Sequence, residues 1–322
     1  MTYYYYCDCT FNDNFDFVSD SQYESCSFDG VDIDYRFSDC NFSDCNFSCT
    51  AIDISSSEIS DSYLVAGMLD NRGMTDCLFL RTAFEADSPE DVRRELRFRN
   101  CDLSNLTFKV IDCVTFDDCT LGAFVAIEAV QCRFIKCTSL DVYFEELKDC
   151  LIVRCQWPYI FSANTVTETE IRDCNLKGAK FSGGAINDLE CSNCNLDKAI
   201  FERLNINLLV LDECSTCQAS FIDSEITGLN IAFDLVSHDL SPSAEARSMR
   251  FYNGSICNSA LSDIPAQSTV FECYRIDLEA DFCNLSDSCF RNCSGTIVDF
   301  GSILADLDLD EYSENNLEFV EG

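Results

Sequence analysis

Between residues 171 and 231 the hydrophobic positions recur at a strict spacing of five. A small or apolar residue, such as Cys174, Ala179 or Leu189, stands two positions before each central residue. This period matches neither an α-helix nor a flat β-strand, and its persistence predicts a solenoid of short repeats whose stacked neighbours share one core. The central residues are Ile171, Leu176, Phe181, Ile186, Cys191, Leu196, Phe201, Ile206, Leu211, Thr216, Phe221, Ile226 and Ile231.

Three segments carry the repeat in its clearest form, with Leu or Phe at the centre and Ala or Cys two residues earlier. They are 172–181 (RDCNLKGAKF), 192–201 (SNCNLDKAIF) and 38–47 (SDCNFSDCNF). In these segments the chain resembles the pentapeptide-repeat family. The resemblance implies an all-β fold, a right-handed quadrilateral parallel β-helix, in which each five-residue unit makes one face and turns its centre and its minus-two side chain inward. We expect residues 1–322 to form one such array.

A second and longer period, of eighteen positions, runs through 97–168. Three units of five and one of three make up this period, which predicts coils with one shortened face, followed after Ile171 by coils of twenty. A three-sided left-handed helix fits less well, because hexapeptide positions 98, 104, 110 and 116 read Phe, Ser, Val and Phe. Side chains in equivalent positions should stack at about 4.8 Å. The predicted core ladders are Phe98, Phe116, Phe134 and Ile152, and Cys101, Cys119, Cys137 and Cys155.

Two excursions, at about 60–96 and 234–254, interrupt the five-residue pattern. In the first, Ser88 reads as an N-cap before Pro89 and two acidic residues, which predicts a short helix over 89–96. In the second, residues 243–250 predict a turn or two of helix. Tyr3 to Tyr6 are expected to cover the open end of the first coil. The acidic tail 303–322 is a terminal cap, a dimer contact or a frayed end.

The chain contains 24 cysteines, and many of them occupy the inward minus-two position of the repeat. Free cysteine behaves as a small buried hydrophobe. We therefore interpret the cysteines as reduced thiols rather than a disulfide framework, which favours a cytoplasmic location. The sequence has no apolar run long enough to cross a bilayer and no basic segment followed by an apolar one at its start. It therefore predicts neither a membrane span nor a signal peptide.

The spacing Cys191-x-x-Cys194 and Cys214-x-x-Cys217 is typical of a zinc site. Here the offset between the two pairs equals one coil, so Cys194 should lie beneath Cys214 in the core while Cys217 points outward, and the four thiolates cannot converge. We expect neither metal nor cofactor. The sole histidine, His238, lies in the second excursion and is interpreted as a surface residue, which disfavours an enzyme. Acidic residues are too numerous to exclude a carboxylate pair for glycoside hydrolysis.

The net charge is −36, which disfavours direct binding to nucleic acid and favours a basic partner. Spread along stacked coils, it gives about 0.5 negative charges per Å, close to the roughly 0.6 per Å of duplex DNA. The family resemblance implies a DNA mimic that acts on DNA gyrase or topoisomerase IV. The alternatives are a protein-interaction scaffold or effector, and acidity that serves solubility or a salt-adapted cytoplasm.

The excursions hold the residues we expect to select a partner, because cations on so acidic a chain run against the general trend. These candidates are Arg93, Arg94, His238, Arg247 and Arg250. For any single arginine, a local ion pair that offsets repulsion is the simpler interpretation. A homodimer through a terminal coil is a further expectation for an array whose ends expose backbone.

Overall fold

The fold is described from a computed structural model. All regular structure in the described ranges is β-strand, and these ranges contain no helix. The chain divides into two compact units, the first formed by Met1–Phe144 with Cys150–Gln156 and the second by Glu145–Asp149 with Trp157–Gly322. The structure describes residues 4–11, 18–28, 34–48, 51–65, 76–85, 91–93, 96–103, 108–139, 141–157, 160–232, 250–262, 270–281, 289–290, 294–300, 308–309 and 316–321.

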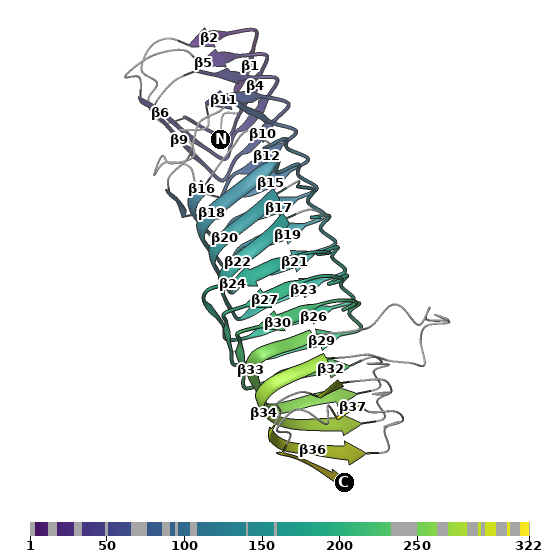
Figure 1. Cartoon of the computed structure of the whole chain (residues 1–322). Helices are drawn as coiled ribbons and strands as arrows, with labels where there is room; N and C mark the ends of the chain where they lie inside the picture. The colour runs from purple at the N-terminus through teal and green to yellow at the C-terminus, as the bar shows by residue number, and fades with distance from the viewer. Residues whose placement is uncertain are drawn as a thin grey trace, which may run out of the picture. The chain divides into compact units, whose positions relative to one another are not determined.

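The main sheet of the first unit is a ladder of parallel strands, one from each coil (Figure 1). Neighbouring strands pair with their repeat centres opposite each other, so that Phe79, Phe98, Phe116, Phe134 and Ile152 form one column. The five-residue period thus places one apolar residue of each coil on the same inward line. The strands of this sheet are β1 (Tyr4–Cys7), β4 (Ser21–Glu24), β7 (Asn41–Ser43), β10 (Glu58–Ser60), β12 (Leu78–Leu80), β15 (Arg97–Arg99), β17 (Thr115–Asp117), β19 (Arg133–Ile135) and β21 (Leu151–Val153).

Other faces of the same coils form further strands. A five-stranded sheet contains β2 (Thr10–Phe11), β5 (Ser27–Phe28), β8 (Asn46–Phe47), β11 (Tyr63–Val65) and β13 (Ala83–Glu85). A three-stranded sheet contains β3 (Val18–Ser19), β6 (Asp34–Ser38) and β9 (Ala51–Ser55). The remaining strands are β14 (Asp91–Arg93), β16 (Phe108–Asp112), β18 (Ala123–Val130) and β20 (Asp141–Lys148), which contributes to both units.

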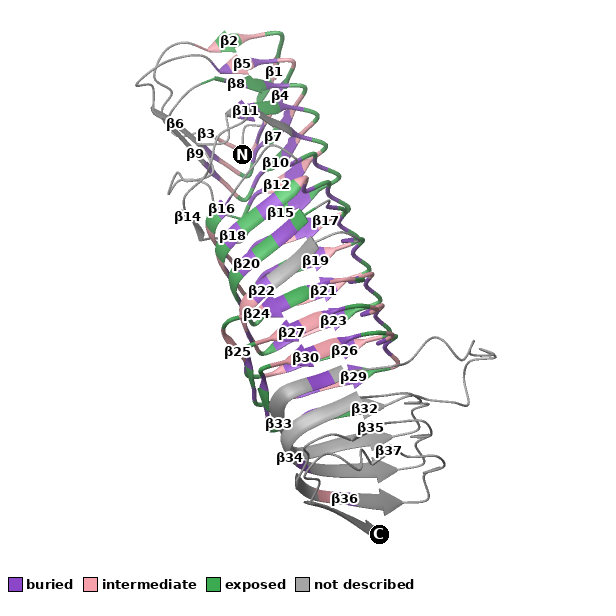
Figure 2. Ribbon diagram, viewed as in Figure 1, coloured by how far each residue is buried: buried purple, intermediate pink, exposed green. Residues whose placement is uncertain are grey.

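Coils in the middle of the chain have one short face among their four. From Phe116 the buried centres run through Leu121, Ala126 and Ala129 to Phe134, which gives spacings of five, five, three and five. The eight-residue strand β18 passes through the short unit without a corner, and buried and exposed positions alternate along its first half (Figure 2). The predicted shortened face is therefore part of one continuous strand, with no corner between the two units that form it.

Between Thr169 and Ala232, the coils of the second unit have four stacked faces of full length. Phe181, Phe201 and Phe221 form one column, and their rings stack with centroid distances of 4.9 and 4.6 Å. The other faces stack Ile186 on Ile206 and Cys191 on Leu211 in the same register. The strands are β22 (Ile160–Thr167), β23 (Thr169–Arg172), β24 (Lys180–Ser182), β25 (Ala185–Ile186), β26 (Leu189–Ser192), β27 (Ile200–Glu202), β28 (Asn205–Ile206), β29 (Leu209–Asp212), β30 (Ser220–Ile222), β31 (Glu225–Ile226) and β32 (Leu229–Ala232).

Parallel strand pairing continues through the described residues after Arg250, with shifts of register between β33 and β34. Phe251 lies opposite Phe221 and Phe271, and the tail segment Asn316–Glu321 pairs with Ser294–Phe300 of the preceding coil. Part of the acidic tail is therefore a strand of the array. These strands are β33 (Arg250–Ser262), β34 (Val270–Asp281), β35 (Cys289–Phe290), β36 (Ser294–Phe300), β37 (Asp308–Leu309) and β38 (Asn316–Glu321).

The change to longer coils occurs at one corner of the second unit. Strand β22 pairs Ala163 with Phe181 but Val166 with Ile186, so the offset between paired positions increases by two along this strand. The added length therefore lies between Phe181 and Ile186. Gly184 is required there, because a Cβ at this position would lie 2.3 Å from the carbonyl oxygen of Asn164.

The cysteine column of the first unit lies beside the aromatic column. The buried thiols of Cys119, Cys137 and Cys155 donate to carbonyl oxygens of the preceding coil at 3.4, 3.5 and 3.5 Å. All the cysteines whose side chains the structure describes, which lie between Cys7 and Cys217, are free thiols. Burial raises the pKa of the Cys45 thiol to about 12, so this side chain acts as a neutral core residue.

Backbone conformation explains part of the chain's acidity. Many of the non-glycine residues with positive φ in the described chain are aspartates, and they stand at coil corners. Aspartate tolerates the left-handed region because its short side chain bonds locally. These corner carboxylates would therefore be present whatever the partner.

The helix predicted over 89–96 is wrong in its described part. Asp91–Arg93 form β14, which pairs with β16 so that Asp91 lies opposite Val110 and Arg93 opposite Asp112. Hydrogen bonds to the neighbouring coil outweigh the local capping signals, which would have favoured one short helical turn. Much of the predicted excursion at 60–96 is likewise array, since β11, β12 and β13 lie within it.

Two further predictions concern the ends of the excursions and of the chain. The second predicted helix, at 243–250, lies outside the described residues except for Arg250, which begins β33. Tyr4 to Tyr6 belong to β1, the first described strand, instead of covering it. The ring of Tyr6 stacks on Tyr23 at 5.0 Å, while Tyr4 and Tyr5 are about half exposed.

Candidate functional site: an acidic face of the second unit

One side of the second unit carries most of the carboxylates between residues 168 and 232. It is built by β23, β26 and β29 with the corner residues before and after each strand, and we call it the acidic face. The face carries seven carboxylates and one cation, Arg172, for a net charge of −6. The carboxylates are Glu168, Glu170, Asp173, Asp188, Glu190, Asp212 and Glu213.

The strand register fixes the positions of these side chains. Glu170 lies opposite Glu190, and Ser192 opposite Asp212, in adjacent rows. The centres beneath them, Ile171, Cys191 and Leu211, are buried, so the backbone that presents the charges is held by the core. Rows about 4.8 Å apart spread this charge over roughly 14 Å. The resulting density is about 0.4 charges per Å, compared with about 0.6 for duplex DNA.

The other three sides of these coils are neutral in sum. Four carboxylates and four cations lie there. Glu202 pairs with Lys180 at 3.3 Å and with Arg203 at 3.4 Å, so part of this charge is compensated locally. On the acidic face, Arg172 pairs with Glu170 and Asn193 donates to Asp173 at 2.7 Å. The net negative charge of these coils is thus confined to one side.

Local backbone preferences do not account for the acidic face. Glu170 and Glu190 stand within strands, where carboxylates are depleted. Glu168 and Glu213 have φ of 49° and 51°, although glutamate lacks the short side chain that helps aspartate adopt this conformation. Only Asp173, with φ of 52°, fits the corner on conformational grounds. Backbone conformation therefore explains few of the carboxylates on this face.

The predicted partner-binding residues fall largely elsewhere. Arg93 lies on β14 in the first unit, and Arg250 begins β33 in the second, opposite Ser220 and Val270. Arg94, His238 and Arg247 lie outside the described residues. The predicted ladder residues lie in the core of the first unit, all at most 2% exposed. The structure does not bring Arg93 and Arg250 together in one unit.

The four cysteines with zinc-like spacing lie at two levels of the second unit. Cys191, Cys194 and Cys214 are buried and Cys217 is half-buried. The thiol of Cys194 donates to the Ile171 carbonyl and that of Cys214 to the Cys191 carbonyl, both at 3.4 Å. A metal ligand must be a thiolate. Burial raises the pKa of the Cys191 thiol, whereas hydrogen bonds from the Cys174 and Cys214 thiols lower the pKa of Cys194. Among the described residues, no group of three or more histidine, cysteine or acidic side chains is arranged to hold a metal ion.

The acidic face escaped the sequence analysis because its members are separated by whole coils. The available signal was the offset of one coil, which aligns Glu168 with Asp188 and Glu170 with Glu190. Counting charge by position within the coil, rather than along the chain, would have found it.

Comparisons with known proteins concern the architecture. No protein-family model matches the chain, and no curated protein sequence matches it. Two structures of trypsin-treated QnrB1, a plasmid-mediated fluoroquinolone resistance protein, are each 17% identical to it. The two matches span 58% and 81% of this chain and 82% and 91% of the respective QnrB1 chains, with TM-scores of 0.28 and 0.18.

The structure of HetL, a pentapeptide repeat protein involved in heterocyst differentiation regulation from the cyanobacterium Nostoc sp. strain PCC 7120, is 11% identical. This match spans 93% of this chain and 88% of the HetL chain, with a TM-score of 0.16. Among the residues that the structure describes, none belongs to a helix with the length and hydropathy that a membrane crossing needs. The five-residue period and the parallel coils built from it give this chain the fold of a pentapeptide-repeat β-helix.

Proposed function

We propose that the chain is a non-enzymatic binding protein whose acidic face occupies the DNA-binding surface of a basic partner. The net charge of −6 on β23, β26 and β29 carries this proposal. The partner we propose, from the resemblance of the repeat, is a type II topoisomerase such as DNA gyrase. The free thiols suit a reducing cytoplasm, where such a partner is found.

The physical basis is electrostatic complementarity on a rigid support. A surface shaped for DNA presents Lys and Arg at the spacing of phosphates, and carboxylates at a similar charge density can displace the same counterions. Buried centres on every row fix the backbone that presents the carboxylates, so binding requires little ordering of the chain itself. Binding should therefore weaken steeply as salt is raised.

The test compares two triple variants that change the charge equally. The first, Glu170→Gln, Glu190→Gln and Asp212→Asn, removes three charges from the acidic face. The second, Glu202→Gln, Asp223→Asn and Glu225→Gln, removes three from the other sides of the same coils. Binding to purified gyrase and inhibition of supercoiling are measured from about 50 to 200 mM salt. Over this range the affinity of proteins for DNA falls steeply.

We expect the acidic-face variant to lose at least roughly tenfold in affinity and to show a shallower salt dependence, while the control variant binds like the parent. Equal losses in the two variants would show that only total charge matters. Failure of the parent to bind gyrase at any of these salt concentrations would refute the choice of partner.

A second candidate is a protein-interaction scaffold without DNA mimicry. Val125, Ile127 and Tyr143, on β18 and β20, are 37%, 43% and 36% exposed, and such side chains suit contact with an ordinary protein. Val125→Thr with Ile127→Thr would then abolish partner capture at all salt concentrations. The DNA-mimic proposal expects no effect from this pair.

A further inference from the structure

The outer side of the main sheet in the first unit has opposite charge in its two halves. Nine strands contribute to this side, from β1 to β21, and their register aligns the outward positions into columns. Each row contains the first and third outward residues of a strand and the corner residue that follows. We call this surface the bipolar side.

The acidic half of the bipolar side comprises the rows of β1, β4, β7 and β10. It contains five carboxylates and no lysine or arginine. The corner residues connect row to row through the backbone, as Asp44 N–H donates to Ser60 O and Asp61 N–H to Leu80 O. The carboxylates are Asp8, Glu24, Asp44, Glu58 and Asp61, all exposed.

The basic half comprises the rows of β12, β15, β17, β19 and β21. It contains six cations and two carboxylates, Asp117 and Asp118, for a net charge of +4 within a chain of net charge −36. Half-buried Leu78, Leu80 and Ile135 lie between the cations and add apolar area. The cations are Arg81, Arg97, Arg99, Arg133, Lys136 and Arg154, all exposed.

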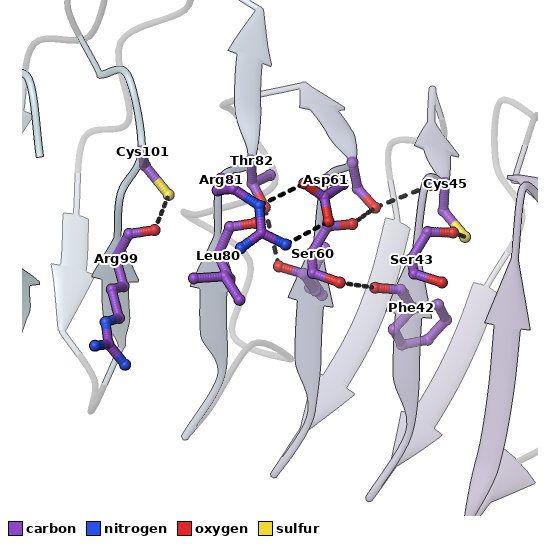
Figure 3. A network of polar contacts seen from close by, with 12 residues as sticks. Phe42, Ser43, Cys45, Ser60, Asp61, Leu80, Arg81, Thr82, Arg99 and Cys101 are labelled. Carbon is purple, nitrogen blue, oxygen red and sulfur yellow. Dashed lines mark hydrogen bonds and ion pairs between the residues drawn. The ribbon is translucent and has the colours of Figure 1, made fainter.

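The boundary between the halves is marked by an ion pair. Arg81 Nε and Nη2 lie 2.6 Å from the two carboxylate oxygens of Asp61 on the adjacent row (Figure 3). A second pair, Arg99 with Asp117 at 3.6 Å, lies within the basic half. Leaving the Arg81–Asp61 pair aside, the acidic half keeps four carboxylates and the basic half keeps five cations against two carboxylates. Each half therefore retains a net charge of its own sign.

We propose that the bipolar side is a docking surface for a second copy of this chain. A two-fold axis parallel to the strands, lying in the plane between the two facing sheets at the level of β10 and β12, would set the acidic half of each copy against the basic half of the other. Such a contact is self-complementary, as a two-fold interface requires, and the same attraction is made twice. The occupant is a second copy because this chain itself supplies both signs in the matching order.

The dimensions of the bipolar side suit such a contact. Nine rows at about 4.8 Å extend roughly 38 Å, and a strand with its corner spans about 16 Å. The product is about 600 Å² per copy, near the ~800 Å² that each partner buries in a standard interface. A nucleic acid fits less well, because the adjoining acidic half would repel its phosphates.

The proposal predicts an unusual salt dependence. At 0.01 M salt the Debye length is about 30 Å, so the net charges of the two copies repel across the whole molecule. Near 0.15 M it is about 8 Å, which screens distant charges but leaves the facing halves in contact range. At 1 M it is about 3 Å, and the attraction is screened as well. Dimerisation should therefore be strongest at intermediate salt.

Sedimentation velocity of the full chain at these salt concentrations tests the proposal. Variant A, Arg97→Glu with Arg99→Glu and Arg133→Glu, gives the basic half a net charge of −2 and so makes both halves of the bipolar side acidic. Variant B, Glu24→Lys with Asp44→Lys and Glu58→Lys, gives the acidic half a net charge of +1 and so makes both halves basic. Each should raise the dimer dissociation constant at least roughly tenfold, because attraction becomes repulsion at two contacts. A matched control, Lys177→Glu with Lys180→Glu and Lys198→Glu in the second unit, has the charge change of variant A and should dimerise like the parent.

Mixing variants A and B is the decisive arm. Both halves of A are then complementary to both halves of B, so the mixture should form a heterodimer although each variant alone is monomeric. Far-ultraviolet circular dichroism checks that both remain folded. A parent that is monomeric at every salt concentration, variants that dimerise like the parent, or a mixture that stays monomeric would each overturn the proposal. The acidic face is untouched by these variants, so failure here leaves the proposed function to its own test.

Discussion

Replacing Gly184 with alanine should destabilise the second unit at the corner where the coil lengthens. The added Cβ would lie 2.3 Å from Asn164 O, 2.7 Å from Thr165 Oγ1 and 2.8 Å from the Asn164 carbonyl carbon. Two of these atoms are backbone, so relief requires adjacent coils to separate by about 1 Å rather than a side chain to rotate. Overpacking of this kind costs about 1–3 kcal/mol, and the backbone contact places Gly184→Ala at about 2–3 kcal/mol.

Urea unfolding measures this cost, and hydrogen exchange locates it. The Asn187 amide donates to the Val166 carbonyl at 2.9 Å across the affected corner, so its exchange should accelerate in Gly184→Ala. The Thr227 amide, which donates to Ile206 two coils farther on, should change much less. Stacked repeats are stabilised mainly by their nearest neighbours, which keeps the damage local.

Gly178→Asn is the matched control. Gly178 has φ of +77° and open space around its Cβ position, and Lys198 and Gln218 occupy the equivalent corner of later coils with φ of 60° and 59°. Asparagine tolerates this conformation, so the cost should stay below about 1 kcal/mol. Equal destabilisation by the two substitutions would refute the argument that the contact with Asn164 is what demands glycine at 184.

Three further predictions follow from burial and exposure. Phe116→Ala should lower the free energy of unfolding in urea by about 3–5 kcal/mol. The reason is that the ring is fully buried and stacks on rings of the neighbouring coils with centroid distances of 5.3 and 5.1 Å. A loss below about 1 kcal/mol would contradict a continuous core. Burial raises the pKa of Cys45 to about 12, so its contribution to stability is complete below the unfolded pKa near 8.5 and is lost as pH rises towards 12. The melting temperature should fall above about pH 9, less so in Cys45→Ala, and a flat profile to pH 11 would contradict this. Arg81→Ala should change stability by less than about 1 kcal/mol, since Arg81 and Asp61 are 52% and 49% exposed, and a double-mutant cycle with Asp61→Ala checks the pair itself.

The fold was predictable because burial in this array depends on position within a short repeat. Every fifth residue meets its equivalent in the next coil, so Phe98, Phe116 and Phe134 follow from aligning the sequence by its longer period. The cysteines were interpretable for the same reason, as the inward minus-two position demands a small side chain. Neither inference needs knowledge of distant contacts.

Other features depend on interactions that local sequence does not encode. Ser88 and Pro89 carry a helix-start signal, yet Asp91–Arg93 pair with β16 in the next coil. The two halves of the bipolar side could not be found from the sequence, because the coils that form them have unequal lengths. The column of centres there runs through Tyr23, Phe42, Ile59 and Phe79 at spacings that differ from row to row. No fixed period therefore aligns the outward charges of these rows.

The corner at Gly183 and Gly184 shows that the perimeter of this fold can be altered without disturbing its interior. Extra chain enters between Phe181 and Ile186, while Phe181 still lies opposite Ala163 and Ile186 opposite Val166. Evolution can therefore lengthen or shorten one turn of the chain by small steps, provided that the inserted residues avoid the carbonyl beneath. An engineer could use the same corner to add a loop, leaving the stacked columns on both flanks as a fixed frame.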